Sequence, residues 1–479
     1  MNAPIARLYV LVLVMFAVLI AFTSRWSVFE ADALNDNALN RRSVFEEQRI
    51  KRGLIRAADG TVLARSVPAQ DDTFRRTYPE GGLFSHAIGY SYTTLGRAGL
   101  ERSRNDDLAG RRGELGSVID RVIGRDPIGD NVLTTLDPRA QRIALGALNG
   151  RKGSVVAIEP STGAVKVMAS TPGFDPRDLR STKTFERLAT DNDNSPLLNR
   201  ATQAGYPPGS TFKVVTAAAA LDSGRFQPNS TIDGNSGKPI SGVPLANSGG
   251  RDFGPVTLTT ALTNSVNTVW ADVAEQLGKQ TMQKYMKRFG FGEDPPLDYP
   301  DGQMLPSGEY VAGRGLVPAT SRFVDVGRMA IGQDKLRVTP LQMAMVAAAV
   351  ANRGRLMRPH LTDRVVDIDG RTVDRIEPEE QARVMSAGNA DKLIEMMTNV
   401  VREGTGTAAA LSGIDVAGKT GTAEIDPSRD INQPWFIGFA PAKNPKIAIA
   451  VTIERTTGGQ GGVVAAPIAK QVMESLLNG

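Results

Sequence analysis

A serine and a lysine stand three residues apart in residues 207–213, which read Pro-Pro-Gly-Ser-Thr-Phe-Lys. An apolar run at 214–221 follows directly and Gly224 ends it, so Ser210 is predicted at the start of a helix. Residues three apart share a helix face, which lets the Lys213 amine reach the Ser210 hydroxyl. The helix N-terminus favours a neutral lysine and a developing oxyanion. The pair could perform nucleophilic catalysis. Alternatively, Ser210 merely caps the helix.

The chain has no cysteine and only two histidines, His86 and His360. Disulfides, thiol nucleophiles, cysteine-based zinc sites and histidine-rich metal sites are therefore excluded. A Ser-His-Asp triad would need one of these two histidines, and no G-x-S-x-G segment supports it. We expect no metal and no cofactor, and any acyl-transfer chemistry must use a base other than histidine.

A second polar motif, Ser265-Val266-Asn267, lies between two predicted helical stretches. The Ser265 hydroxyl could pass a proton towards a leaving group, and the Asn267 amide could hold a backbone group of a substrate. The alternative is a polar turn that joins two helices, since S-x-N is a common pattern.

The third motif, Lys419-Thr420-Gly421-Thr422, contains the only K-T-G of the chain. On a strand at the edge of a cleft, its ammonium and hydroxyl groups would bind a substrate carboxylate. The missing side chain of Gly421 would let a substrate backbone lie close. A solvated turn is the alternative interpretation.

Residues 413–420 also match the phosphate-loop pattern G-x-x-x-x-G-K-T. A phosphate loop needs an apolar strand before it and a helix after it, whereas here the preceding residues are not strongly apolar and Pro427 follows soon after. We therefore expect no nucleotide.

The pattern of elements predicts an α+β fold. Four strand-like runs predict two antiparallel hairpins, at residues 154–158 with 164–169 and at residues 435–440 with 447–454. Alanine-rich helical patterns such as 214–221 and 341–351 dominate between them, and 465–477 is a further predicted helix. We expect an antiparallel sheet from both ends of this part, covered by helices from its middle.

A change in sequence texture predicts a domain boundary between residues 132 and 133. Residues 133–136 are strand-like, and Asp137-Pro138 then starts a helix that runs to about residue 148. Before the boundary, residues 25–132 mix β-like runs such as 60–64 and 83–90 with Gly and Arg, which predicts an elongated, mostly β, non-catalytic N-terminal module. Residues 133–479 form the predicted catalytic domain.

Residues 8–22 are apolar and uncharged, which predicts a single membrane-spanning anchor within residues 1–24. A cleaved signal peptide is the alternative, since residues 21–23 resemble a weak cleavage site. Either interpretation exports the rest of the chain, so we expect the catalytic domain outside the cytoplasmic membrane.

The net charge is 56 − 51 = +5, but basic residues occur in pairs rather than in long runs. This distribution disfavours nucleic-acid binding.

In order, S-x-x-K at 210, S-x-N at 265 and K-T-G at 419 form a set typical of penicillin-binding proteins and class A β-lactamases. The whole chain resembles the class B penicillin-binding proteins, and most closely the actinobacterial penicillin-binding protein A branch. Three signatures of the N-terminal module carry this resemblance, together with five segments of the catalytic part: 52–64, 76–90 and 99–110, then 153–160, 199–200, 206–213, 332–342 and 419–424. The chain departs from the pattern at Ala57-Ala58 and at Val266, the latter being unusual in class A β-lactamases.

The resemblance implies a penicillin-binding transpeptidase fold and a D,D-transpeptidase activity on peptidoglycan stem peptides. Ser210 would attack the carbonyl between two terminal D-alanines, and Lys213 would take its proton. Ser265 and Lys419 would relay this proton to the leaving D-alanine.

The same resemblance assigns the remaining site residues. Asn267 would hold the substrate backbone, while Thr420 and Thr422, beside Gly421, would bind the terminal carboxylate. The backbone N–H groups of Ser210 and Thr422 would form the oxyanion hole.

The resemblance further implies acylation and inhibition by β-lactam antibiotics, with slow release because no E-x-x-L-N segment is present. It also implies a membrane glycan polymerase of the shape, elongation and division family as a partner. Three alternatives stay open: a D,D-carboxypeptidase or β-lactamase-type serine hydrolase, a β-lactam sensor, and a nucleotide-binding protein.

Overall fold

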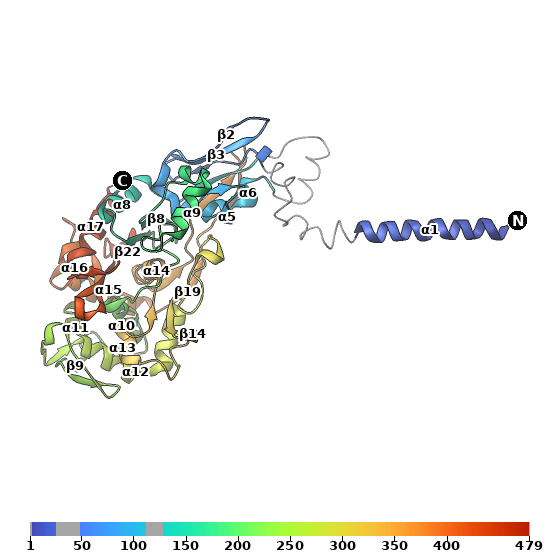
Figure 1. Cartoon of the computed structure of the whole chain (residues 1–479). Coiled ribbons are helices and arrows are strands. Elements are labelled where there is room, and N and C mark those ends of the chain that lie inside the picture. The colour runs from blue at the N-terminus through green and yellow to red at the C-terminus, as the bar shows by residue number, and fades with distance from the viewer. Residues whose placement is uncertain (1, 25–47, 112–127, 479) are drawn as a thin grey trace.

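The computed structural model describes residues 2–24, 48–111 and 128–478 (Figure 1). Helix α1 (Asn2–Ser24) comes first in the chain. Among the described residues, no helix combines the length and the apolar character of a membrane span. The anchor predicted within residues 1–24 therefore stays a prediction.

An antiparallel sheet forms the centre of the catalytic part, with strand order β20-β21-β22-β7-β8. Its strands are β7 (Gly153–Ile158), β8 (Val165–Thr171), β20 (Ala417–Asp426), β21 (Ile431–Ala440) and β22 (Ile447–Ile453), with the short β23 (Thr456–Thr457) beside β21. Both predicted hairpins are confirmed, because β7 pairs with β8 and β21 pairs with β22, each antiparallel. The pairing of β22 with β7 joins the two ends of the catalytic part, as predicted.

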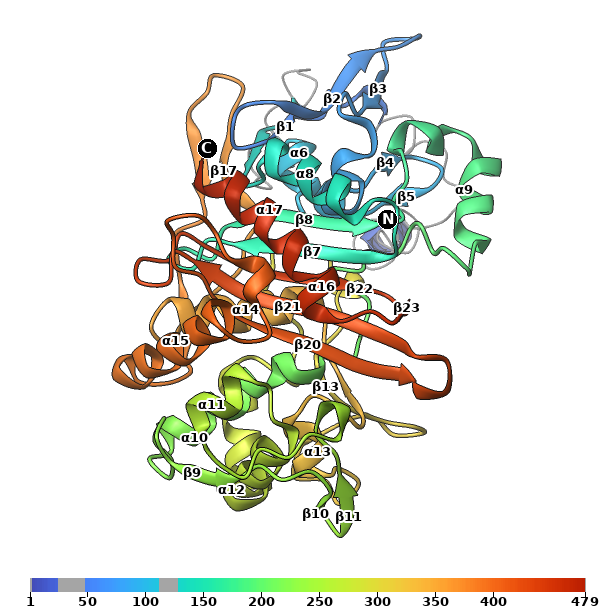
Figure 2. The ribbon, with the colours of Figure 1, turned by 90° about the vertical axis from the view of Figure 1, so that its left-hand side faces the viewer.

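Each face of this sheet packs against its own set of helices. Val155 and Ala157 of β7 belong to a core cluster with α8 (Pro138–Leu148) and α17 (Ala466–Leu477), whereas Val156 belongs to a separate cluster with α14 (Pro340–Ala351). This division follows from the alternation of side chains along a strand. Figure 2 shows α17 and α8 across one face. Helices from the middle of the chain therefore cover only one face, and helices from the two ends cover the other.

A helical region lies beside β20 in Figure 2. It contains α10 (Lys213–Asp222), α11 (Leu258–Thr263), α12 (Asn267–Arg288), α13 (Val326–Ala330) and α15 (Ala387–Arg402). Its short strands are β9 (Thr231–Asp233), β10 (Lys238–Ile240), β11 (Val243–Leu245), β12 (Pro255–Thr257), β13 (Gly308–Val311), β14 (Gly315–Val317) and β15 (Leu336–Arg337). Helix α14, next to this region, is buried at all of its positions, because all of its residues except Gln342 are apolar and the Gln342 side chain donates to the carbonyl of Phe289.

A second sheet, of order β18-β17-β6-β1-β2-β3, joins the N-terminal module to the catalytic part. Its strands are β1 (Ile55–Arg56), β2 (Val62–Pro68), β3 (Phe74–Thr77), β6 (Asn131–Thr134), β17 (Thr362–Val366) and β18 (Thr372–Arg375). The boundary predicted between residues 132 and 133 falls inside β6. Because β17 and β18 come from the catalytic part, the two parts share backbone hydrogen bonds.

The remaining described elements are short. Around the two sheets lie β4 (Ser91–Tyr92), β5 (Gly96–Arg97), α5 (Gly99–Ser103), α6 (Asn105–Leu108), α9 (Thr182–Thr190), β16 (Arg355–Met357), β19 (Glu380–Arg383) and α16 (Gly461–Val464). The predicted β-like run at 83–90 is wrong. It lies in a 3₁₀ turn (Gly81–Phe84) and α4 (Ser85–Ile88), because Phe84 and Ile88, four residues apart, are both buried on one helical side.

A buried ion triad holds the N-terminal module together. Arg52 Nη2 lies 3.0 Å from Glu101 Oε2, and Arg76 Nε lies 2.5 Å from Glu101 Oε1. Burial by itself would raise the pKa of Glu101, but the guanidinium groups of Arg76 and Arg52 lower it. Arg52, Arg76 and Glu101 come one each from the three N-terminal signatures, so this triad joins the three signatures in the fold.

We predict that Glu101→Gln destabilises the fold by about 3–5 kcal/mol, because it leaves two buried guanidinium groups without their counter-charge. Urea unfolding followed by circular dichroism measures the change. The matched control is Asp391→Asn, which breaks an exposed ion pair with Arg353 and should leave the curve unchanged. Coincident unfolding curves for Glu101→Gln and the parent would contradict the structural role of the triad.

Candidate active site

Ser210 lies where the sequence predicts it, at the start of a helix. It is the second residue of a 3₁₀ turn (Gly209–Phe212) that leads directly into α10. Gly209 adopts φ +52°, and its N–H donates to the carbonyl of Gly332 at 2.9 Å. This left-handed geometry favours glycine, so Gly209 lets the chain turn sharply before Ser210.

The Lys213 amine is buried and points at the S-x-N motif. Its Nζ donates to the Ser265 carbonyl at 2.8 Å, to Ser265 Oγ at 3.2 Å and to Asn267 Oδ1 at 2.7 Å. Ser265 lies between α11 and α12, as predicted, with φ +59°, a strained conformation for a residue other than glycine. The structure therefore holds Ser265 against its local preference in contact with Lys213.

The Lys419 amine reaches the same serine hydroxyl from β20. Its Nζ donates to Ser265 Oγ at 2.9 Å and to the carbonyl of Thr420 at 2.9 Å. Two lysine amines thus converge on the Ser265 hydroxyl, although Lys213 and Lys419 are far apart in the sequence. This contact brings the three sequence motifs into one site.

Both amines favour the neutral form more than an exposed lysine does. Burial lowers the pKa of Lys419 from its usual value to about 7. Burial and the charge of Lys419 lower the pKa of Lys213 well below its usual range. Two ammonium groups this close repel each other, so the arrangement favours one neutral amine at neutral pH. With Lys213 neutral and Lys419 charged, the Ser265 hydroxyl accepts from Lys419 and can donate to the Lys213 lone pair.

The Ser210 hydroxyl makes no hydrogen bond within the described part of the chain. The structure therefore shows no hydrogen bond between Lys213 and Ser210. Their direct contact during the reaction stays a prediction. Catalytic hydrogen bonds are often long before a substrate binds. No acceptor within the described part of the chain therefore competes with Lys213 for the proton of the Ser210 hydroxyl.

The K-T-G motif lies on β20, at the edge of the central sheet, as predicted. Thr420 Oγ1 lies 2.6 Å from Thr405 Oγ1, and Thr422 Oγ1 accepts from the N–H of Gly461 at 3.2 Å. The strand excludes the phosphate-loop alternative, because that site needs a loop that leads into a helix, whereas residues 417–426 are extended.

The structure gives Gly421 a packing role in addition to the predicted one, which stays a prediction. A Cβ at this position would lie 2.7 Å from the carbonyl oxygen of Pro208 and 3.0 Å from Thr211 Cγ2. The missing side chain therefore lets the segment that carries Ser210 pack against β20. A Cβ at Gly209 would likewise lie 3.0 Å from Thr422 C, so the two backbone stretches predicted to supply the oxyanion hole lie side by side.

Neither histidine belongs to the site. His86 Nε2 is bonded to the carbonyl of Pro196, and burial lowers the His86 pKa to about 4. His360 lies beside Arg358, and its backbone pairs with Ala164 next to β8. The described residues contain no group of three or more His, Asp or Glu side chains that could hold a metal ion.

Gly332 and Trp435 are site residues that the motifs alone do not assign. A Cβ at Gly332, which has φ +78°, would lie 1.9 Å from the carbonyl oxygen of Gly209. Trp435 Nε1 donates to the carbonyl of Pro207 at 2.9 Å. Both residues fix the turn before Ser210. Gly332 lies in a segment that carries the family resemblance, but only the fold shows what it contacts.

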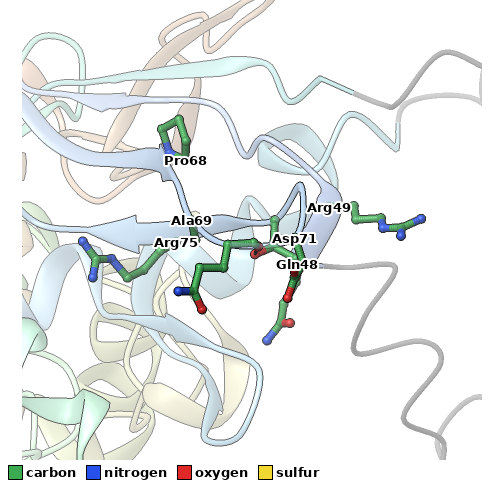
Figure 3. Close-up of a pocket in the computed structure, with 8 residues that line it drawn as sticks. Gln48, Arg49, Pro68, Ala69, Asp71 and Arg75 are labelled. Atoms are coloured by element: carbon green, nitrogen blue, oxygen red, sulfur yellow. Dashed lines mark hydrogen bonds between the residues drawn. The ribbon is translucent and has the colours of Figure 1, made fainter.

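A separate hollow of about 680 Å³ lies at the hairpin of β2 and β3. Figure 3 shows Gln48, Arg49, Asp71 and Arg75 around it. None of the three motifs contributes to its lining, so it is distinct from the site at Ser210.

Two family models match the chain. The penicillin binding protein transpeptidase domain matches residues 153–474, and the penicillin binding protein A dimerisation domain matches residues 52–132. The first match alone covers more than half of the chain. The chain belongs to the penicillin-binding protein transpeptidases. The resemblance inferred from the motifs is thereby confirmed.

Relatives of this penicillin-binding protein are similar over the full length. The peptidoglycan D,D-transpeptidase PbpA of Mycolicibacterium smegmatis is 36% identical over 507 aligned positions, which cover 100% of this chain and 99% of the relative. The ceftriaxone acyl-enzyme complex of penicillin-binding protein A from M. tuberculosis has a TM-score of 0.81 at 34% identity, covering 90% of this chain and 99% of the other. Structures of the same mycobacterial protein as imipenem and penicillin G acyl-enzyme complexes are also similar to this chain.

We predict that Gly332→Ala slows acylation by a fluorescent penicillin at least tenfold, because the new Cβ would displace Gly209 and with it Ser210. The matched control is Gly302→Ala, where a Cβ meets nothing within 4 Å and the rate should stay unchanged. Stopped-flow fluorescence measures the rate, and circular dichroism confirms that both variants fold. A parental rate in folded Gly332→Ala would show that this contact does not position Ser210.

Proposed function

We propose that this penicillin-binding protein is a serine D,D-transpeptidase that cross-links peptidoglycan stem peptides. The observation that carries this proposal is the convergence of the buried Lys213 and Lys419 amines on one hydroxyl, Ser265, behind a serine at a helix start. The arrangement supplies a base, a proton relay and a nucleophile without histidine or metal. The names and acyl-enzyme structures of the relatives agree with it.

In the first half-reaction, Ser210 Oγ attacks the carbonyl carbon between two terminal D-alanines. Its proton passes to the neutral amine of Lys213. The bond from carbon to the leaving nitrogen then breaks. Ser265 donates its proton to that nitrogen and takes the proton held by Lys213 in its place, while Lys419 stabilises the relay. The products are a free D-alanine and an ester on Ser210.

The negative charge that develops on the carbonyl oxygen needs fixed donors. The backbone N–H groups of Ser210 and Thr422 supply them in this proposal, supported by the close packing of Gly209 against β20. Asn267 holds the substrate backbone with its amide. Thr420 and Thr422 bind the terminal carboxylate, assisted by the nearby positive charge of Lys419.

In the second half-reaction, the amine of a neighbouring stem peptide attacks the ester carbon. Lys213 accepts a proton from this amine, the bond from carbon to Ser210 Oγ breaks, and the oxygen regains its proton. An amide cross-link forms and the enzyme is restored. A D,D-carboxypeptidase or β-lactamase would use water in this step, and the full-length similarity to named transpeptidases favours the amine.

A β-lactam would enter the first half-reaction in place of the stem peptide. Its strained amide opens when Ser210 attacks, and no leaving group departs to make room for an acceptor. We expect a long-lived acyl-enzyme, in agreement with the ceftriaxone, imipenem and penicillin G complexes of the mycobacterial relative.

The test is intact-mass analysis after incubation with benzylpenicillin, beside Ser210→Ala. We expect the mass of one penicillin to be added to the parent alone and to persist for many minutes. With stem-peptide donors and acceptors, we expect cross-linked dimers to exceed hydrolysed monomers. Rapid drug turnover or a predominance of hydrolysis would favour the serine-hydrolase alternative, and an equal adduct on Ser210→Ala would exclude Ser210 as the nucleophile.

We also propose that residues 1–24 anchor the chain in the cytoplasmic membrane, with the catalytic domain outside and a membrane glycan polymerase as partner. Helix α1 has 23 residues, and at about 1.5 Å per residue it is roughly 34 Å long. A bilayer core is about 30 Å thick. Within α1, the structure describes every side chain only over residues 7–20. The large apolar side chains of this stretch are exposed.

For this proposal, we predict that the full chain sediments with membranes and resists extraction by carbonate, whereas a chain that begins at residue 48 stays in the supernatant. The physical reason is the loss of the exposed apolar side chains of α1. External protease added to spheroplasts should digest the catalytic domain. Recovery of the full chain in the soluble fraction, or protection of its catalytic domain, would contradict the anchor or its orientation.

A further inference from the structure

A pocket of about 280 Å³ lies between the C-terminal half of α12 and the strands β13 and β14. Its apolar lining includes Met286, Phe291, Leu316 and Val317. None of the residues of the three motifs lines it. The pocket is therefore separate from the site at Ser210, and its volume, near the lower end for ligand sites, has room for about nine water molecules at about 30 Å³ each.

Glu309 lines this pocket from the middle strand of a three-stranded sheet. Strand β13 is flanked by β14 and β15, and Glu309 pairs with Val317 on one side and with Leu336 on the other. The residue has 0% exposure, and both of its carboxylate oxygens are buried without a hydrogen-bond partner among the described residues. Buried carboxylates ordinarily have a hydrogen-bond or ion-pair partner. The described part of the chain provides none for Glu309.

Protonation does not resolve this deficit. Burial, together with the charge of Asp334, raises the pKa of Glu309 to about 8. A protonated Glu309 would still have one O–H donor and one carbonyl oxygen, and neither has an acceptor or donor within the described part of the chain. A group from outside the chain is needed to satisfy either form.

Most of the charged groups around Glu309 are engaged or lie at the lining, although Asp334 Oδ2 is also buried without a hydrogen-bond partner among the described residues. Lys335 Nζ donates to Asp334 Oδ1 at 2.6 Å, and Arg337 Nη1 donates to backbone carbonyls of Asp334 and Leu336. The other charged residues of the lining are Lys287 and Glu293. Lys335 and Arg337 lower the Glu309 pKa, but they do not bond to the carboxylate.

We propose that this pocket is a binding site for a small aliphatic ammonium ligand, which pairs its charge with Glu309 and packs its alkyl chain against Met286, Phe291 and Leu316. An ammonium group carries the donors that two unpartnered carboxylate oxygens require. A metal ion is disfavoured, because the described residues hold no group of three carboxylate or histidine side chains.

One lining residue of the pocket, Phe291, contacts the 3₁₀ turn that carries Ser210. The ring of Phe291 packs edge-on against the ring of Phe212, with centroids 5.5 Å apart and an interplanar angle of 84°. Phe212 is two residues after Ser210. The ligand is thus linked to the segment of the nucleophile through one aromatic contact, while it stays outside the site at Ser210.

Isothermal titration with n-pentylamine tests the proposal, on the full chain with and without prior acylation by benzylpenicillin. We expect binding at one site per chain in both samples, and no binding of n-pentanol, which has the same alkyl chain without the charge. Binding to protonated Glu309 releases one proton to the buffer. Affinity should therefore rise about tenfold per pH unit below pH 8 and level off above it, until the amine itself loses its proton near pH 10.4.

The decisive variant is Glu309→Gln, which should lose n-pentylamine binding, and the matched control is Glu293→Gln, an exposed carboxylate of the lining that should keep it. Should Glu309→Gln fail to fold, the pH slope of the parent still decides. The proposal is overturned by absence of binding, by an affinity that does not change with pH, or by retention of binding in folded Glu309→Gln. Loss of binding on acylation would also overturn it, because it would place the amine at the site of Ser210.

Discussion

The site depends on two lysine amines that are buried around one serine hydroxyl. Lys213 and Lys419 are both fully buried, and their Nζ atoms lie 3.2 and 2.9 Å from Ser265 Oγ. Burying an ammonium group is costly, and burying two that repel each other is more so. The same repulsion and burial favour one neutral amine near pH 7. A base that activates a serine nucleophile needs such a neutral amine.

This arrangement needs a rigid support, which the central sheet and the small residues around Ser210 provide. β20 supplies Lys419, and the turn before Ser210 packs against it through Gly209 and Gly421, with Gly332 on its other side. At each of these positions a Cβ would come within 3 Å of a backbone atom. The nucleophile is thus positioned by close backbone contact, which varies less with side-chain motion than contacts between long side chains.

The N-terminal module also buries charged groups, but there the charges have opposite signs and attract each other. Glu101 is fully buried between Arg52 and Arg76, so each of three separate segments supplies one member of a triad that is unstable when incomplete. The six-stranded sheet then links this module to β17 and β18 of the catalytic part. Glu309 contrasts with both sites, because its carboxylate is equally buried but has no partner among the described residues.

The sequence by itself determined the local elements and the identity of the reactive groups. The helix start at Ser210, the loop position of Ser265, both hairpins and the pairing of the chain ends were predictable, because they depend on capping residues, turn residues and the period of apolar positions. The run at 83–90 was misassigned, since a short apolar segment fits a strand or a helical turn until its packing is known.

Only the tertiary structure decided how these groups meet. It places the Lys213 amine on Ser265 and Asn267 rather than on Ser210, and it shows that Gly421 makes room for Pro208 and Thr211. It also reveals the Glu309 pocket, which no motif marks. Distances between residues 52 to 154 positions apart, and the burial that shifts the pKa values of the two lysines, arise from packing across the whole domain and leave no local pattern in the sequence.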